Sequence, residues 1–109
     1  MAQSLLVVIV EKDFFLDVCE ALEASSITAF TCLHGTGTGI WQQVDRWVNP
    51  EKIVFMSVIN KSQQEAAYDS LRKRVSLDMP GRGIAFSMPV ESGIGVGIPA
   101  DGTSAAADA

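Results

Sequence analysis

The chain has 109 residues, a length typical of one domain, and 48% of them are hydrophobic, which is enough for a core without disulfide or metal support. The net charge of −5 argues against DNA or RNA as the main partner, because binding a phosphate backbone needs a basic surface. The apolar runs are too short to span a membrane, and the N-terminus lacks the basic segment of a signal peptide, so a cytoplasmic location is expected.

The first half of the chain predicts a strand, a helix and a second strand. Residues 5–10 (LLVVIV) are uniformly apolar and rich in β-branched residues, which is typical of a central strand buried on both faces. Asp13 is placed to cap the helix that follows. One face of that helix carries an apolar stripe at helical spacing, made of Phe15, Val18, Cys19 and Leu22. The β-branched and aromatic content of residues 27–33 (ITAFTCL) predicts a second strand.

The second half of the chain repeats this order. Residues 52–59 (KIVFMSVI) predict another central strand, and Ser62 with Glu65 fits a capping box at a helix start. The inward side of that helix is expected to carry Ala67, Tyr68, Leu71 and Val75. In residues 84–91 (IAFSMPVE) apolar residues alternate with small or polar ones, which predicts a strand with one buried face. Pro89 places that strand at a sheet edge, because proline lacks a backbone N–H.

The order of these elements predicts an α+β domain of the ferredoxin-like split βαβ type (βαββαβ), with an antiparallel four-stranded sheet and two helices on one face. Strands 5–10 and 52–59 would lie in the middle, and their apolar residues would leave the uncovered face apolar. Monomers rarely expose such a surface, so we expect an oligomer that buries it. The domain is expected over residues 1–95, and residues 96–109, rich in small residues, are expected to form a loose or disordered tail.

Two glycine-containing stretches are candidate ligand contacts. HGTGTG (residues 34–39) follows the second strand, and PGRG (residues 80–83) precedes the last one. Glycines let backbone N–H groups approach a ligand closely, and consecutive N–H groups form a nest for anions. Arg82 adds a guanidinium fork suited to phosphate oxygens. Both stretches also fit a simpler interpretation, in which the first is a flexible hinge and Arg82 is a solvated turn residue.

In order and spacing, three segments resemble the PII-like signalling protein superfamily, over roughly residues 4–92. VVIVEKDFFLDVCEALEASSI is similar to the family's first strand and helix, HGTGTG to the base of its mobile T-loop, and MPGRGIAFSMPVES to its B-loop and last strand. The resemblance implies a ferredoxin-like homotrimer that binds an adenine nucleotide (ATP, ADP or AMP) in clefts between subunits. The implied ligand-binding residues are Gly35, Thr36, Gly37 and Thr38 on one side, and Gly81, Arg82 and Gly83 on the other.

The resemblance also implies a regulatory role. A small effector, a nucleotide or another small anion, would be sensed and the signal passed to a protein such as a membrane transporter or an enzyme through a T-loop-like excursion over residues 34–50. Trp41 and Trp47 in this excursion are the expected partner-binding residues, because aromatic anchors often dominate interfaces. Their other interpretation is packing on their own or a neighbouring subunit. The excursion has no tyrosine to modify, and SGIGVG after the last strand has no basic residue, so a divergent relative is expected rather than a typical nitrogen sensor.

Other functions remain open on the same fold. A structural or metal-tolerance trimer of the CutA type would share the fold and the assembly without a nucleotide switch, whereas PGRG at residues 80–83 favours the PII-like interpretation. Cys32 and His34 would lie on the same face of a strand, but two ligands are fewer than zinc normally needs, so no metal site is expected. With 1 histidine and no recognisable nucleophile or carboxylate arrangement, no catalytic residues and no enzymatic activity are expected.

Overall fold

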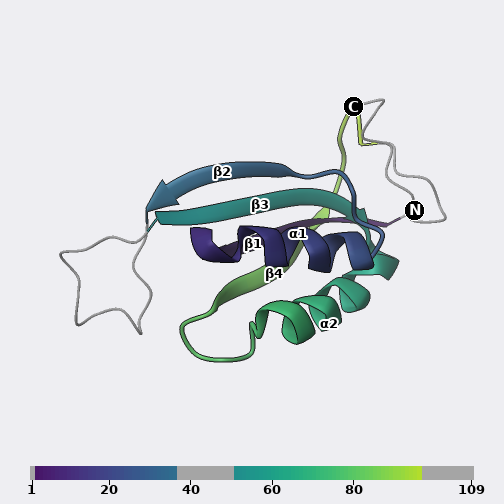
Figure 1. Cartoon of the computed structure of the whole chain (residues 1–109). Coiled ribbons are helices and arrows are strands. Elements are labelled where there is room, and N and C mark those ends of the chain that lie inside the picture. The colour runs from purple at the N-terminus through teal and green to yellow at the C-terminus, as the bar shows by residue number, and fades with distance from the viewer. Residues whose placement is uncertain (1, 37–50, 97–109) are drawn as a thin grey trace.

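The computed structural model describes residues 2–36 and 51–96, which form a 4-stranded antiparallel sheet with two helices on one side (Figure 1). The strands are β1 (Gln3–Glu11), β2 (Thr31–Thr36), β3 (Glu51–Asn60) and β4 (Gly83–Val90), in the sheet order β2-β3-β1-β4. The helices are α1 (Phe15–Ala24) and α2 (Gln64–Val75), each entered through a 3-10 turn, η1 (Lys12–Phe14) and η3 (Lys61–Gln63). The predicted ferredoxin-like α+β fold is confirmed.

Neither helix of the described residues is long and apolar enough to cross a membrane.

The hydrophobic core lies between the sheet and the two helices. Alternate residues of the central strands point toward the helices, and the apolar stripes of the helices meet them. The strand side consists of Leu6, Val8, Val10, Ile53, Phe55 and Ile59, and the helix side of Val18, Ala21, Leu22, Ala67, Leu71 and Val75. Phe15 is 36% exposed at the rim of this core, where its ring stacks on Phe55 with the centroids 5.7 Å apart. The predicted central strands and both helical stripes are thus confirmed.

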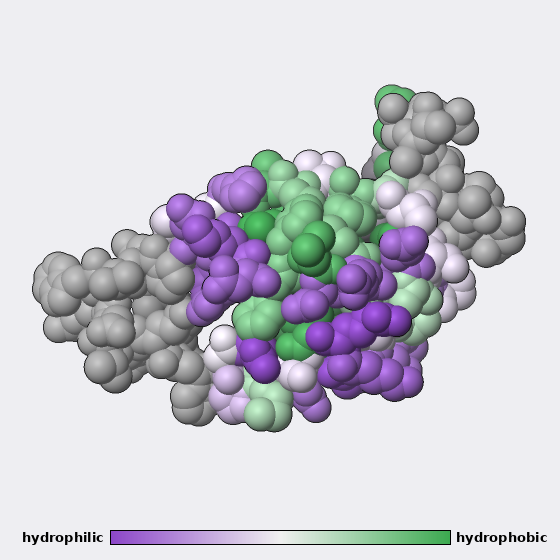
Figure 2. Space-filling model, in the orientation of Figure 1, coloured by the Kyte–Doolittle hydropathy of each residue, from purple (hydrophilic) through white to green (hydrophobic). Residues whose placement is uncertain are grey.

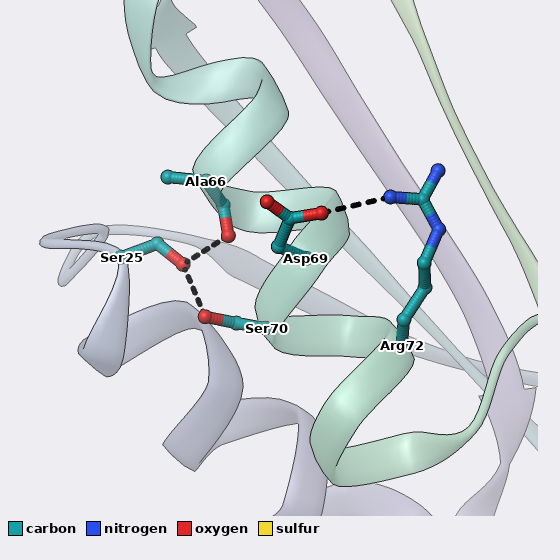
Figure 3. A network of polar contacts seen from close by, with 5 residues as sticks. All are labelled: Ser25, Ala66, Asp69, Ser70 and Arg72. Carbon is teal, nitrogen blue, oxygen red and sulfur yellow. Dashed lines mark hydrogen bonds and ion pairs between the residues drawn. The ribbon is translucent and has the colours of Figure 1, made fainter.

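A buried serine joins the end of α1 to α2 (Figure 3). The Ser25 hydroxyl oxygen lies 2.9 Å from the carbonyl oxygen of Ala21 in its own helix. It also lies 3.3 Å from the carbonyl oxygen of Ala66 and 3.1 Å from the hydroxyl of Ser70, both in α2. These contacts supply the polar groups in the helix interface with partners, as burial requires.

The sheet face opposite the helices is apolar and has no covering layer in the described chain. On this face the strand register aligns three rows of side chains, Ile9 with Val54 and Ile84, Val7 with Met56 and Phe86, and Leu5 with Val58 and Met88. Leu33 of β2 extends the first row beside Val54. We call this surface the apolar sheet face. The exposed fractions are 55% for Ile84, 46% for Met88 and 49% for Leu33. The prediction of an apolar uncovered face is therefore confirmed.

Two strand predictions were wrong in detail. The second strand was expected over residues 27–33, but β2 spans Thr31–Thr36. Ile27 is apolar because it is buried beneath the helices, not because it belongs to a ladder. In β4 the apolar residues of the alternation were expected on the buried face. Instead they lie on the apolar sheet face, while Ala85 and Ser87 pair with Val8 and Leu6 and so face the helices.

Both predicted helix caps also differ from those observed. Asp13 lies inside η1, whose N-cap is Glu11, so it does not precede the helix. At the second helix the side-chain carbonyl of Gln63 accepts a hydrogen bond from the backbone N–H of Asn60, at 2.9 Å. That contact starts the helical segment two residues before Ser62, the predicted cap. In both places the chain passes from a strand directly into a 3-10 turn, and this shifts the start of the helical segment.

A candidate ligand site at one end of the sheet

The two glycine-containing stretches lie at the same end of the sheet but on opposite edges. Gly35 and Thr36 are the last residues of β2, paired with Lys52 and Glu51 of β3. Gly83 begins β4, which forms the other edge. Since β3 and β1 lie between them, the two stretches are three strand spacings apart, or about 14 Å. The structure therefore does not bring them into contact within one chain.

The turn that leads into β4 is fixed by its glycines and by a backbone hydrogen bond. The Arg82 backbone N–H donates to the Met79 carbonyl at 3.3 Å. Gly81 has φ +85° and Gly83 has φ +141°, both in the region that favours glycine. A Cβ on Gly83 would lie 2.4 Å from the carbonyl oxygen of Ile9 in β1. The chain can therefore approach β1 this closely only with glycine at this position.

Arg82 presents a cation at this turn. Its guanidinium carbon lies 4.9 Å from the centroid of the Phe14 ring, which packs against the core. Within residues 2–36 and 51–96, no carboxylate forms an ion pair with Arg82. By contrast, Arg72 of α2 is paired with Asp69 at 2.9 Å (Figure 3). The N–H groups of the Arg82 fork are thus available to an anion, the ligand that such a fork binds best.

The β2 edge of the same sheet end has a balanced charge. The Lys12 Nζ forms an ion pair with Glu51 Oε2 at 3.4 Å, and the Lys52 Nζ forms one with Glu11 Oε1 at 3.9 Å. These pairs join the end of β1 to the start of β3, beside Gly35. An anion at this edge would therefore depend on backbone N–H groups rather than on an unpaired cation.

The remaining predicted contacts lie outside the described residues. These are Gly37 and Thr38 of the ligand-binding set, and Trp41 and Trp47 of the partner-binding set. Gly35 and Thr36, predicted as part of a loop, are strand residues, because the strand begins and ends later than expected.

Sequence reasoning missed a groove between α2, the turn and β4. It has a volume of about 450 Å3 and is lined by Tyr68, Leu71, Arg72, Leu77, Asp78, Ala85, Phe86 and Ser87. At its wall the Tyr68 hydroxyl donates to Ser87 Oγ at 2.9 Å, and Ser87 Oγ donates to the side-chain oxygen of Gln64 at 2.6 Å. A polar Ser87 in an otherwise small or apolar strand was the available signal, since a half-buried hydroxyl needs a partner.

The cysteines and the histidine do not form a metal site among the described residues. Cys32 and His34 pair with Phe55 and Ile53, so they share the helix side of the sheet as predicted. Burial raises the pKa of the Cys32 thiol and also that of Cys19. In the described ranges, no group of three His, Cys, Asp or Glu side chains gathers in a way that could hold a metal ion.

Figure 2 shows the molecule as in Figure 1, with hydrophobic surface in the middle of the view between hydrophilic regions. On α1, Leu16 is 69% exposed next to the half-exposed Phe15. A small exposed apolar area of this kind is common on monomers, whereas the continuous rows of the apolar sheet face are not.

Comparisons with known proteins place this geometry among solved structures. No protein-family model matches the sequence, and no match was found among curated proteins. The PII protein of Arabidopsis thaliana, solved bound to citrate, superimposes with a TM-score of 0.64 at 20% identity, over 81% of this chain and 74% of that one. CPII, a nitrogen regulatory PII-like protein from Thiomonas intermedia K12 bound to ADP, AMP and bicarbonate, superimposes with a TM-score of 0.67 at 12% identity, over 86% and 96%. The chain therefore has the fold of the PII and PII-like proteins, as the resemblance of its motifs predicted.

Proposed function

We propose that this chain is a PII-like regulatory protein that senses a small phosphate-bearing effector, an adenine nucleotide, in clefts between neighbouring subunits. The observation that carries the proposal is the location of Gly35 and Arg82 at one end of the sheet but on opposite edges. Within one chain, β1 and β3 separate them. When the β2 edge of one subunit meets the β4 edge of the next, both stretches face the same cleft.

The apolar sheet face supports an assembly, which we propose to be a homotrimer. Its central rows include Ile84, Phe86 and Met88, each more than a third exposed in the single chain. Burial of apolar area contributes about 25 cal/mol per Å2, so the burial of these faces against one another favours association. In such a trimer the three apolar sheet faces would point toward the threefold axis and cover one another, and the helices would lie on the outside.

The local charges favour an effector with few phosphates. Arg82 offers one fork, and residues 91–96 after β4 contain neither lysine nor arginine. One guanidinium suits one phosphate bidentately, whereas a triphosphate requires more countercharge. AMP and ADP, which CPII binds on the same fold, are therefore the first candidates, and another small anion the second.

The signalling part of the proposal concerns residues 37–50. The β1–β3 ladder extends to Glu11 and Lys52 where this segment joins the sheet, and the ion pairs of Lys12 and Lys52 lie beside that end. A ligand that contacts Gly35 would act on the start of the segment, and a ligand shifts a conformational equilibrium only by binding one state better. Trp41 and Trp47 would then report the state to a protein target. The proposed role is binding and signalling in the cytoplasm, without catalysis.

Calorimetry with AMP, ADP and ATP tests the proposal, with light scattering to measure the assembly. The Arg82→Ala variant should weaken AMP and ADP by about 1.5–3 kcal/mol, the range for a hydrogen bond to a charged group. Arg72→Ala, which removes a cation already paired with Asp69, is the matched control and should leave the affinity unchanged. A stable trimer that binds no nucleotide would instead support the CutA-type alternative, and a stable monomer would contradict the assembly.

A further inference from the structure

We infer that Phe14 is a positioning residue for Arg82, whose guanidinium it holds in place for a ligand phosphate before the ligand arrives. The inference rests on the proposed function and adds to it a residue that no sequence motif singled out. Its basis is the position of the guanidinium carbon over the Phe14 ring, 4.9 Å from the centroid.

Both partners of this contact are fixed to the same end of β1. Phe14 ends η1, which follows β1 directly, and its ring packs against the hydrophobic core. Arg82 precedes Gly83, which pairs with Val10 of β1. The close approach of Gly83 to the Ile9 carbonyl leaves the backbone at this point little freedom. The β1–β4 pairing therefore determines where the arginine and the ring meet.

The chemistry of the contact leaves the arginine free to bind. A cation is attracted to the face of an aromatic ring by the ring quadrupole. A ring face has no oxygen to accept the paired N–H bonds of a guanidinium, so it does not occupy these donors as a carboxylate would. No carboxylate in the described residues forms an ion pair with Arg82. A long side chain that is already held loses less rotamer freedom on binding, which favours affinity.

Calorimetry of AMP, with adenosine as the phosphate-free probe, tests the role of the ring. Phe14→Leu keeps an apolar side chain but removes the ring, and should weaken AMP about two- to fivefold, the range for an exposed cation–π contact, without changing adenosine. Phe14→Tyr keeps the ring face and should bind AMP like the wild type. Phe15→Leu is the matched control, since the Phe15 ring stacks on Phe55. In an Arg82→Ala background, Phe14→Leu should have no further effect on AMP.

The outcomes separate the inference from the proposed function. If the wild type does not bind AMP or ADP, the proposed function fails and the inference with it. If AMP binds through Arg82 but Phe14→Leu behaves like Phe15→Leu, only the inference is overturned. An equal loss of AMP and adenosine, or an undiminished effect in the Arg82→Ala background, would show a structural role for Phe14. Light scattering and thermal unfolding check each variant, and Phe14→Met replaces Phe14→Leu if the latter does not fold.

Discussion

The hydroxyl of Tyr68 in α2 donates a hydrogen bond to Ser87 Oγ in β4, over 2.9 Å. Ser87 Oγ donates in turn to the side-chain oxygen of Gln64, at 2.6 Å. In the sheet, β4 is an edge strand that pairs with β1. This chain of hydroxyl contacts therefore attaches the edge strand to the helix that covers it.

Loss of the tyrosine hydroxyl should weaken this attachment. Tyr68→Phe removes one donor and leaves Ser87 bonded to Gln64, so the free energy of unfolding should fall by about 0.5–1.5 kcal/mol. Urea denaturation at a fixed protein concentration measures it, since the stability of an oligomer depends on concentration. In a Ser87→Ala background the same substitution should cost less. Strictly additive effects would contradict a direct bond.

Two glycines of the candidate site should differ strongly in their tolerance of alanine. In Gly83→Ala the new Cβ would lie 2.4 Å from the Ile9 carbonyl oxygen and 2.9 Å from Val10 Cγ1, at φ +141°. We expect the free energy of unfolding to fall by about 3 kcal/mol or more, as for other severe backbone conflicts. A Cβ on Gly35 would have no heavy atom within 4 Å outside its own and the adjacent residues, so Gly35→Ala should change the free energy of unfolding by less than about 1 kcal/mol. Thermal unfolding of both variants, side by side, makes the comparison, and equal stabilities would refute it.

A charge on the apolar sheet face should dissociate the assembly. Met88→Glu places a carboxylate in the row of Leu5 and Val58, where an unpaired charge is costly to bury. Light scattering should then show a smaller species than the wild type. Leu16→Glu, at a position 69% exposed on α1, is the control and should leave the mass unchanged. If both variants keep the wild-type mass, this face is not the interface.

The two thiols should make stability depend on pH at the alkaline end. Burial raises the pKa of Cys19 and of Cys32, so the folded state holds these protons more tightly than the unfolded chain. Their contribution is fully present below the ordinary thiol pKa of about 8.5 and is lost as pH rises through the raised values. From pH 8 to higher pH, the free energy of unfolding should therefore fall less in Cys32→Ala than in the wild type. An identical decline in the variant would exclude the thiol as a cause.

Much of the fold followed from residue patterns, because burial on both faces leaves a clear signature. The apolar runs within β1 and β3 indicated central strands, and the helical stripes matched the core. The start of β2 was missed because Ile27 is apolar for burial under the helices, and composition alone does not separate that from strand pairing. The alternation in β4 was recognised, but not that its apolar residues lie on the sheet face away from the helices. Nothing in a period of two tells which side of a sheet the helices cover.

The candidate site was harder to predict than the fold. Arg82 and the glycines around it were predicted as ligand contacts because their residue types suit an anion, and this stays a prediction. The Phe14 ring beneath Arg82 was not found, because Phe14 and Arg82 are far apart in sequence and meet only through the β1–β4 pairing. The groove beside Ser87 also required the three-dimensional arrangement of α2 and β4.

The two glycine stretches lie on opposite sheet edges, so in the proposed function each chain would carry two half-sites that face in different directions. In a closed ring of identical subunits, head-to-tail contacts repeat around the axis. Each subunit then completes one cleft with its β2 end and the next cleft with the turn before β4. The two half-sites are joined through the continuous ladders of β3 and β1. Ligands in successive clefts would therefore share a subunit. Through that subunit, binding in one cleft would be able to raise or lower the affinity of the next cleft, and no further structural element would be needed.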